Sequence, residues 1–241
     1  MKPRIGITVH MAEHSEGRNQ AEVRFSLTAR YAEAVLEAGG LPLLLPTHPD
    51  SAAPPAEVVS IVDGLLLSGG GSLPRQYFAD NPNPSLRQTN PLRFDVEVAL
   101  VRAARAERLP ILGICRGHQT MLEALGGAPV RNLDAEAGDA DHYQSQPSDV
   151  TTHGLRTVPG SRLAGWLGEE TRVNSFHRQV VQEVPPGWRV AAWSDDGLVE
   201  AIEASEGFAI GLQFHPEWLE QREPAFRRIF EAFVAAAAAR S

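Results

Sequence analysis

Residues 110–119 read Pro-Ile-Leu-Gly-Ile-Cys-Arg-Gly-His-Gln, an apolar run that passes directly into a helical pattern. The apolar part predicts a buried strand at residues 110–114, and Cys115 follows it between Gly113 and Gly117. This spacing is typical of a sharp strand-to-helix turn, in which the middle residue is strained and side chains at the flanking positions would collide with their neighbours. The stretch therefore predicts a parallel α/β fold with Cys115 at the carboxyl edge of the sheet, where open α/β sheets place their sites.

Short apolar runs alternate with helical patterns through the first half of the chain, as in the βα units of a parallel sheet. Strands are predicted at residues 4–8, 43–45 and 65–67, and helices at residues 26–38, at residues 94–105, and from directly after Cys115 through residues 120–125. Strand-like runs and a last amphipathic helix follow at residues 172–174, 190–193, 199–202, 209–214 and 224–236. Residues 72–91 and 135–148 lack periodicity and predict loops. We expect one domain, residues 1–241, with a mostly parallel sheet covered by helices on both faces.

The composition excludes several classes of protein. Of the 241 residues, 43% are hydrophobic and 22% are charged, as in an ordinary globular domain. The net charge is −8 and neither end carries a Lys/Arg cluster, so nucleic acid is not an expected partner. No run reaches the ~20 apolar residues that span a bilayer, and residues 5–9 are too few for a signal peptide core, so we expect a cytoplasmic protein. Cys115 is the only cysteine, which excludes an intrachain disulfide and a tetrathiolate zinc site.

A second polar motif, Gln-Phe-His-Pro-Glu at residues 213–217, ends the last predicted strand. In an extended backbone His215 and Glu217 leave the same face, and Pro216 limits the freedom between them. The carboxylate can then hold one imidazole nitrogen while the other faces the thiol of Cys115, as nucleophile, base and orienting group do in a triad. The alternatives are a surface salt bridge for His215 and Glu217 and a small buried hydrophobe for Cys115, but the flanking glycines favour the triad.

A glycine run, Ser-Gly-Gly-Gly at residues 68–71, follows the strand predicted at residues 65–67. It lacks both the G-x-G-x-x-G spacing and the Lys-Ser/Thr ending of a nucleotide-binding loop. The bare backbone N–H groups of Gly70 and Gly71, together with the amide of Arg116, instead predict an oxyanion hole.

Taken in order along the chain, these motifs resemble those of the class-I glutamine amidotransferases. The resemblance is carried by the glycine run at 68–71, Gly-Ile-Cys-Arg-Gly-His-Gln at 113–119 and His-Pro-Glu at 215–217. Four further features resemble the free-standing branch, the gamma-glutamyl-gamma-aminobutyrate hydrolase family of C26-type peptidases: Arg116, Ile-Gly-Ile-Thr at 5–8, Val-Asn-Ser-Phe-His-Arg-Gln at 173–179 and Asp-Gly-Leu-Val-Glu-Ala at 196–201. Together the motifs cover nearly the whole chain.

The resemblance implies a flavodoxin-like three-layer sandwich, the class-I glutamine amidotransferase fold. It also implies that a gamma-glutamyl amide is hydrolysed through a thioester on Cys115, with no metal and no organic cofactor. Gln119 is implied to line the gamma-glutamyl pocket, and backbone groups of Asn174, Ser175 and Phe176 to bind the substrate's α-carboxylate. The alternatives are that Gln119 only forms hydrogen bonds from its helix and that the other three form an ordinary strand-to-loop transition.

The chain departs from the family pattern at three places, which leaves the substrate open. Arg-Phe-Asp at residues 93–95 replaces an Arg-Asp pair, and Ala-Pro-Val-Arg at residues 128–131 replaces Thr-Leu-x-Gln. His177 and Arg178 replace a double histidine.

The remaining polar candidates receive plainer interpretations. We expect His118 to be a packed histidine of the elbow helix rather than a substrate contact. Asp139, Asp141 and His142 carry metal-ligating atoms, but they lie in a polar stretch without a second ligand cluster. A solvated loop is therefore expected there, and no metal site is predicted.

Three functions remain open for a chain of this kind. The expected one is a self-sufficient hydrolase of a small-molecule gamma-glutamyl amide, such as gamma-glutamyl-gamma-aminobutyrate. The alternative is a glutaminase subunit that delivers ammonia to a separate synthase, and the third is a catalytically silent binding module, against which the intact triad argues. The sequence leaves open the leaving amine, the pathway and the oligomeric state, a homo-oligomer included.

Overall fold

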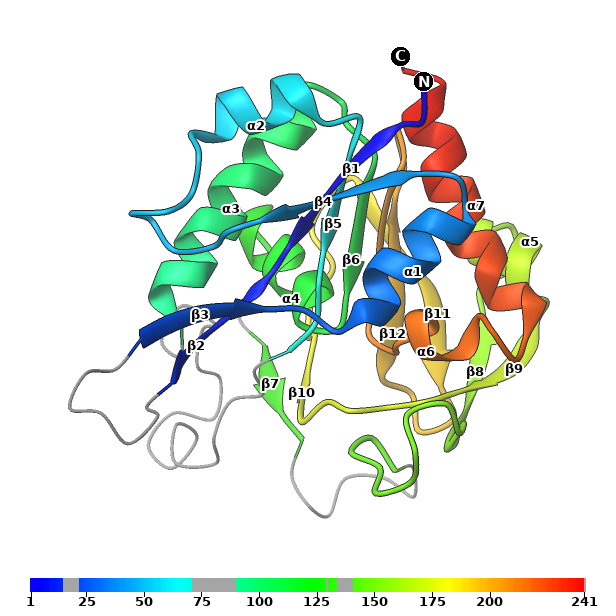
Figure 1. The fold of residues 1–241 in the computed structure, drawn as a ribbon. Helices are drawn as coiled ribbons and strands as arrows, with labels where there is room; N and C mark the ends of the chain where they lie inside the picture. The colour runs from blue at the N-terminus through cyan, green and yellow to red at the C-terminus, as the bar shows by residue number, and fades with distance from the viewer. Residues whose placement is uncertain (15–21, 71–89, 129, 134–140, 241) are drawn as a thin grey trace.

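A nine-stranded sheet forms the centre of the protein (Figure 1). The computed structural model describes residues 1–14, 22–70, 90–128, 130–133 and 141–240. In these residues the strand order is β4-β1-β5-β6-β13-β12-β11-β8-β9. The strands, in chain order, are β1 (Arg4–Thr8), β4 (Leu41–Leu45), β5 (Gly64–Leu67), β6 (Ile111–Ile114), β8 (His153–Thr157), β9 (Glu170–Val173), β11 (Trp188–Ser194), β12 (Val199–Ala204) and β13 (Ala209–Leu212).

The direction of the strands divides the sheet into two halves. Neighbours from β4 to β13 pair in parallel, and neighbours from β13 to β9 pair antiparallel. Only β12 and β8 run against the rest of this described sheet, so the predicted mostly parallel sheet is confirmed. Two smaller pairs lie beside it: β2 (His10–His14) with β3 (Glu22–Ser26), and β7 (Arg131–Asn132) with β10 (Gln179–Val180).

Helices cover both faces of the sheet and complete three layers (Figure 1). One face carries α1 (Ala29–Glu37), α5 (Arg162–Leu167) and α7 (Pro224–Ala238), and the other carries α2 (Pro55–Ile61), α3 (Pro91–Ala106) and α4 (Arg116–Ala124). The single turn α6 (Pro216–Leu219) packs beside α1 and α7. Because strand side chains alternate, Leu66 of β5 joins the core under α1 and α7, whereas Leu65 and Leu67 join the core under α3 and α4.

The structure moves several predicted boundaries. α4 begins at Arg116, directly after Cys115, as the predicted strand-to-helix turn requires, and ends at Ala124. The predicted loop at 72–91 ends in the cap of α3, where the Asn90 side chain accepts the Arg93 N–H at 3.1 Å. Residues 71–89 and 134–140 of the two predicted loops lie outside the described residues. Short elements such as α2 and α5 were not predicted, because one or two turns show no clear period.

No described helix is both long and apolar enough to cross a bilayer.

Candidate active site

Cys115 lies at the turn between β6 and α4. Its backbone has φ 51° and ψ −108°, and a positive φ is rare for a residue other than glycine. A Cβ on Gly113 would lie 2.8 Å from the Gly117 carbonyl oxygen, and a Cβ on Gly117 would lie 2.1 Å from the Leu67 carbonyl oxygen. The two glycines therefore allow α4 to pack directly on the sheet, and the predicted strained turn is confirmed.

His215 and Glu217 meet in a different way from the one predicted. The sequence placed them on one extended segment, but β13 ends at Leu212 and α6 begins at Pro216. Glu217 lies in the first turn of α6 and reaches back, so that its Oε1 is 2.6 Å from His215 Nδ1. The Glu217 side chain is buried, and His215 Nε2 has no hydrogen-bond partner among the described residues. Glu217 therefore holds the ring at Nδ1.

A cavity of about 440 Å³ opens beside the turn. The residues that line it are Gly70, Cys115, Arg116, Gln119, Tyr143, Phe176, His177, Gln179 and His215. Gly69 packs against both proposed reacting side chains, since a Cβ there would lie 2.9 Å from His215 Cε1 and 3.3 Å from Cys115 Cβ. Gly70 has φ +103°, a conformation that glycine adopts without strain. Of the predicted oxyanion-hole residues, Gly70 and Arg116 thus line the cavity, and Gly71 lies outside the described residues.

The charges around His215 favour its protonated form. Burial opposes the charge, but the adjacent Glu217 and Cys115 raise the pKa of His215 well above its usual value. Burial, and then the charges of Glu217 and Cys115, also raise the pKa of Tyr31 well above its usual value. Tyr31 therefore stays a neutral phenol, and its hydroxyl oxygen accepts the Gly69 N–H at 3.0 Å.

The glycine run is held by a buried ion pair that the sequence did not reveal. Arg93 Nε donates to Glu97 Oε1 at 2.8 Å, and both side chains are fully buried. Arg93 Nη2 donates to the carbonyl oxygens of Ser68 at 2.8 Å and Gly69 at 3.3 Å, and Thr8 Oγ1 donates to Glu97 Oε1 at 2.8 Å. The one feature of the sequence that could have predicted this pair is the i, i+4 spacing of Arg93 and Glu97 in the helix.

Gln119 and Phe176 both line the cavity. Gln119 Nε2 donates to the Gln179 carbonyl oxygen at 2.8 Å and to Gln213 Oε1 at 2.9 Å, so its amide nitrogen is already used within the protein. The Phe176 ring packs edge-on against the His215 ring with centroids 5.6 Å apart.

Asn174 and Ser175 do not line the cavity, and their polar atoms bind other parts of the chain. Asn174 Oδ1 accepts the His215 N–H at 2.9 Å, and Asn174 Nδ2 donates to the His215 carbonyl oxygen at 3.0 Å. The Ser175 N–H donates to Gln144 Oε1 at 2.7 Å, and its hydroxyl donates to the His142 carbonyl oxygen at 2.9 Å. Asn174 therefore fixes the backbone that carries the imidazole.

His118 is packed inside the protein, as predicted. It is fully buried on α4, and a Cβ on Gly211 would lie 2.3 Å from its Nδ1. Burial lowers the pKa of His118 to about 3, so the ring is neutral near pH 7.

The prediction of a solvated loop is wrong for His142. Asp139 lies outside the described residues and Asp141 is exposed, but His142 is buried. Its Nε2 lies 3.0 Å from Asp196 Oδ2. Although burial opposes the charge, Glu200 and Asp196 raise the pKa of His142 above its usual value. These partners were missed because they come from distant parts of the sequence.

The chain is similar in sequence to known proteins. A family model described as Peptidase C26 matches residues 3–217. The gamma-glutamyl-gamma-aminobutyrate hydrolase PuuD of Escherichia coli is 33% identical over 221 residues, which cover 88% of this chain and 86% of that protein. A putative glutamine amidotransferase of Mycobacterium tuberculosis is 32% identical over 237 residues, which cover 98% of this chain and 75% of that protein.

Solved structures show the same fold. A putative GMP synthase subunit from Thermoplasma acidophilum has a TM-score of 0.66 at 21% identity, covering 99% of this chain and 96% of that one. A glutamine amidotransferase from Thermotoga maritima has a TM-score of 0.62 at 16% identity, covering 100% of this chain and 98% of that one. The chain therefore has the class-I glutamine amidotransferase fold and belongs to the peptidase C26 family.

Proposed function

We propose that this C26 peptidase hydrolyses a gamma-glutamyl amide, with Cys115 as nucleophile, His215 as base and Glu217 as the carboxylate that orients the ring. The observation that carries the proposal is the shared cavity lined by Cys115 and His215. The Glu217 contact of 2.6 Å to Nδ1 leaves Nε2 of the imidazole available to the reaction. Residues 1–241 act as one domain on a small-molecule substrate.

The first half of the reaction forms a thioester. His215 takes the thiol proton of Cys115, the sulfur attacks the γ-carbonyl carbon, and the carbonyl π electrons move onto oxygen as the C–S bond forms. Backbone N–H groups of Gly70, Gly71 and Arg116 donate to this oxyanion. The tetrahedral species then collapses, the C–N bond breaks, and His215 gives its proton to the leaving amine. The raised pKa of His215 supports this step, because the imidazolium is the acid.

The second half of the reaction consumes water. The neutral His215 ring removes a proton from a water molecule, whose oxygen attacks the thioester carbon. The C–S bond then breaks with its electron pair on the Cys115 sulfur, glutamate leaves, and the thiolate of Cys115 lies again beside the protonated His215. The Glu217 carboxylate stabilises the imidazolium formed in this step.

The relatives and the size of the cavity support a proposal for the leaving amine. The chain is 33% identical over 221 residues to a gamma-glutamyl-gamma-aminobutyrate hydrolase. A cavity of about 440 Å³ falls in the range of small-ligand sites. We therefore propose a gamma-glutamyl amide of a small amino acid or amine, similar to gamma-glutamyl-gamma-aminobutyrate.

A glutaminase subunit is the second candidate, because other relatives are described as putative glutamine amidotransferases, at 32% identity over 207 and 237 residues. The two candidates differ in what they need. A hydrolase binds both the glutamyl head and the leaving amine in its own pocket, whereas a glutaminase subunit reaches full activity only with its synthase.

Turnover by the purified full chain separates these candidates. We expect a higher kcat/KM for gamma-glutamyl-gamma-aminobutyrate than for glutamine, with no change when extract of the source cells is added. A preference for glutamine that the extract accelerates would favour the glutaminase subunit. Absence of turnover on a panel of gamma-glutamyl amides would favour the silent binding module.

A further inference from the structure

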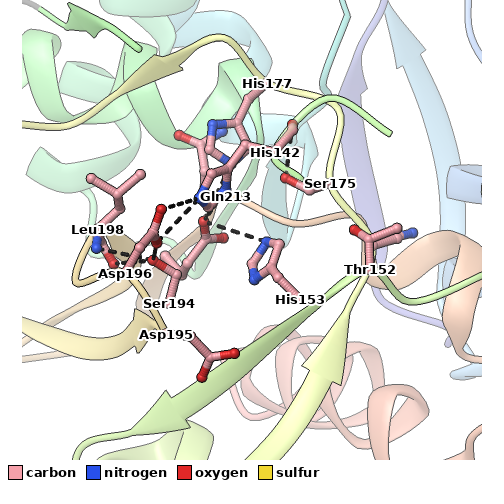
Figure 2. Close-up of polar contacts among 12 residues, drawn as sticks. His142, Thr152, His153, Ser175, His177, Ser194, Asp195, Asp196, Leu198 and Gln213 are labelled. Carbon is pink, nitrogen blue, oxygen red and sulfur yellow. Dashed lines mark hydrogen bonds and ion pairs between the residues drawn. The ribbon is translucent and has the colours of Figure 1, made fainter. Parts of the chain in front are cut away.

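Four side chains with metal-ligating atoms converge at one buried point on the antiparallel half of the sheet. His142 lies next to the isolated bridge at Tyr143, His153 begins β8, His177 lies just before β10, and Glu200 is in β12. They are 6%, 3%, 2% and 0% exposed, respectively. One ligand atom from each residue lies within 4.8 Å of all the others, and Figure 2 shows the three rings pointing toward one another.

Two of the histidines are oriented by backbone carbonyl groups. His153 Nδ1 lies 3.0 Å from the Gly154 carbonyl oxygen, and His177 Nδ1 lies 3.1 Å from the Gln179 carbonyl oxygen. A carbonyl oxygen only accepts, so both Nδ1 atoms carry the hydrogen and each neutral ring has its lone pair on Nε2. These Nε2 atoms lie 3.9 Å and 3.2 Å from Glu200 Oε1. A carbonyl behind the ring and a lone pair in front is the usual state of a metal-binding histidine.

The third histidine is oriented by a carboxylate. His142 Nε2 lies 3.0 Å and 3.2 Å from the two carboxylate oxygens of Asp196, and the Ser194 hydroxyl donates to the same carboxylate. Figure 2 shows this contact between His142 and Asp196. The other nitrogen of the ring, Nδ1, lies 3.5 Å from Glu200 Oε1. Asp196, the His142 ring and the centre of the cluster therefore lie in the same order as the carboxylate, histidine and metal ion of a metal site.

Hydrogen bonds alone leave this centre incomplete. His142 Nδ1, His153 Nε2 and Glu200 Oε2 are buried and have no hydrogen-bond partner among the described residues. Neutral rings would point lone pairs at a carboxylate, which is repulsive. A proton on His142 or His177 would pair that ring with Glu200, but the 3.9 Å contact of His153 Nε2 is too long for a hydrogen bond, and a proton on every ring would bring cations together at ring separations of 4.6 Å and 4.9 Å. A single divalent cation satisfies all four groups at once.

We propose that His142, His153, His177 and Glu200 bind one divalent transition-metal ion, zinc, in a closed four-ligand site. A tetrahedral site with metal–ligand bonds of about 2.0–2.1 Å places its donor atoms about 3.3–3.4 Å apart. The distances from Glu200 Oε1 to the three ring nitrogens are 3.2, 3.5 and 3.9 Å, and the four donor atoms lie within 4.8 Å of one another, so the rings move inward to complete the site. Three imidazoles favour zinc over calcium or magnesium, which prefer oxygen ligands.

The site joins four separate segments next to the proposed active site. Tyr143 and Phe176, which adjoin His142 and His177, form a bridge with each other and line the substrate cavity. A metal ion behind them would hold this wall of the cavity against β8 and β12. The ion has a structural role, since it has no open position for water and none of its ligands is a proposed reacting group. The inference therefore does not rest on the proposed function.

Metal titration of the full chain tests the site. The Cys115→Ala variant serves as the parent, because it removes the one thiol that could compete for zinc. After chelation, titration with Zn²⁺ and dialysis, we expect about one ion per chain and a higher Tm. Co²⁺ in place of Zn²⁺ should give the intense visible absorption of tetrahedral coordination.

Variants in the same parent locate the ion. Glu200→Gln and His153→Gln should each weaken binding at least about tenfold. His48→Gln is the matched control, because His48 lies near Asp50 outside the cluster and should not affect binding.

Three results would overturn the proposal. The first is that the Cys115→Ala parent, after zinc loading and dialysis, retains less than about a tenth of an ion per chain and has an unchanged Tm. Hydrogen bonds and protons alone would then hold the cluster together. The second is full binding by both Glu200→Gln and His153→Gln. The third is the weak absorption of octahedral Co²⁺, which decides the question in the parent alone if a variant fails to fold.

Discussion

Among single residues, Cys115 carries the chemistry that the proposed reaction needs. Cys115→Ala removes only the sulfur from a turn whose shape depends on the flanking glycines, so circular dichroism should be unchanged. We expect kcat to fall by at least about 10³-fold, as when a nucleophile of a triad is removed. A glutamine-like electrophile should add mass to the natural chain and none to the variant. Labelling of the variant would place the nucleophile elsewhere.

Glu217 and His215 differ in what their loss should cost. His215→Ala removes the base, whereas Glu217→Gln leaves an amide that can still contact the ring, so we expect the smaller loss of kcat for Glu217→Gln. Glu217 raises the pKa of His215. The Glu217→Gln substitution should therefore lower the pKa of His215 and move the alkaline limb of the pH–rate profile to lower pH. Equal losses in the two variants and an unmoved limb would contradict the orienting role.

At the level of elements, the contact between α4 and β5 depends on Gly117. A Cβ there would lie 2.1 Å from the Leu67 carbonyl oxygen, a backbone atom that cannot move without distorting the sheet. We expect Gly117→Ala to lower the free energy of unfolding by at least about 1–3 kcal/mol, measured by urea denaturation. Gly165→Ala in α5 is the matched control, because nothing lies within 4 Å of its added Cβ. Gly165→Ala should leave the free energy of unfolding unchanged or raise it by up to ~1 kcal/mol. Equal changes in the two variants would refute the steric argument.

The elements also show which parts of the site the sequence could predict. The strand-to-helix turn at Cys115 was predictable, because its two glycines and the apolar run before it are contiguous. The histidine cluster was not, because residues 142, 153, 177 and 200 meet only after β8, β11 and β12 have paired in register. The path of Glu217 was missed for a local reason. Pro216 is as compatible with a helix start as with an extended segment, and only packing of α6 against α7 selects the helix.

On the scale of the whole molecule, the proposed active site depends on strands and helices that are distant in sequence. The nucleophile comes from the end of β6, and the histidine follows β13, its parallel neighbour. The glycine run follows β5 on the other side. Parallel pairing brings these three strand ends to one edge, which places the parts of the site but does not orient them. Buried polar contacts supply the orientation, Asn174 for His215 and Arg93 for the glycine run.

Arg93 allows stability and positioning to be measured separately. Arg93→Met leaves Glu97 buried without its cation, so we expect the free energy of unfolding in urea to fall by about 3–5 kcal/mol. The double variant Arg93→Met, Glu97→Gln removes both charges but keeps a side-chain oxygen that can accept from Thr8, so it should recover most of that loss. Neither variant can donate to the carbonyl oxygens of Ser68 and Gly69. The kcat/KM of the double variant should therefore stay low although its stability returns, and recovery of both together would show that Arg93 acts on stability alone.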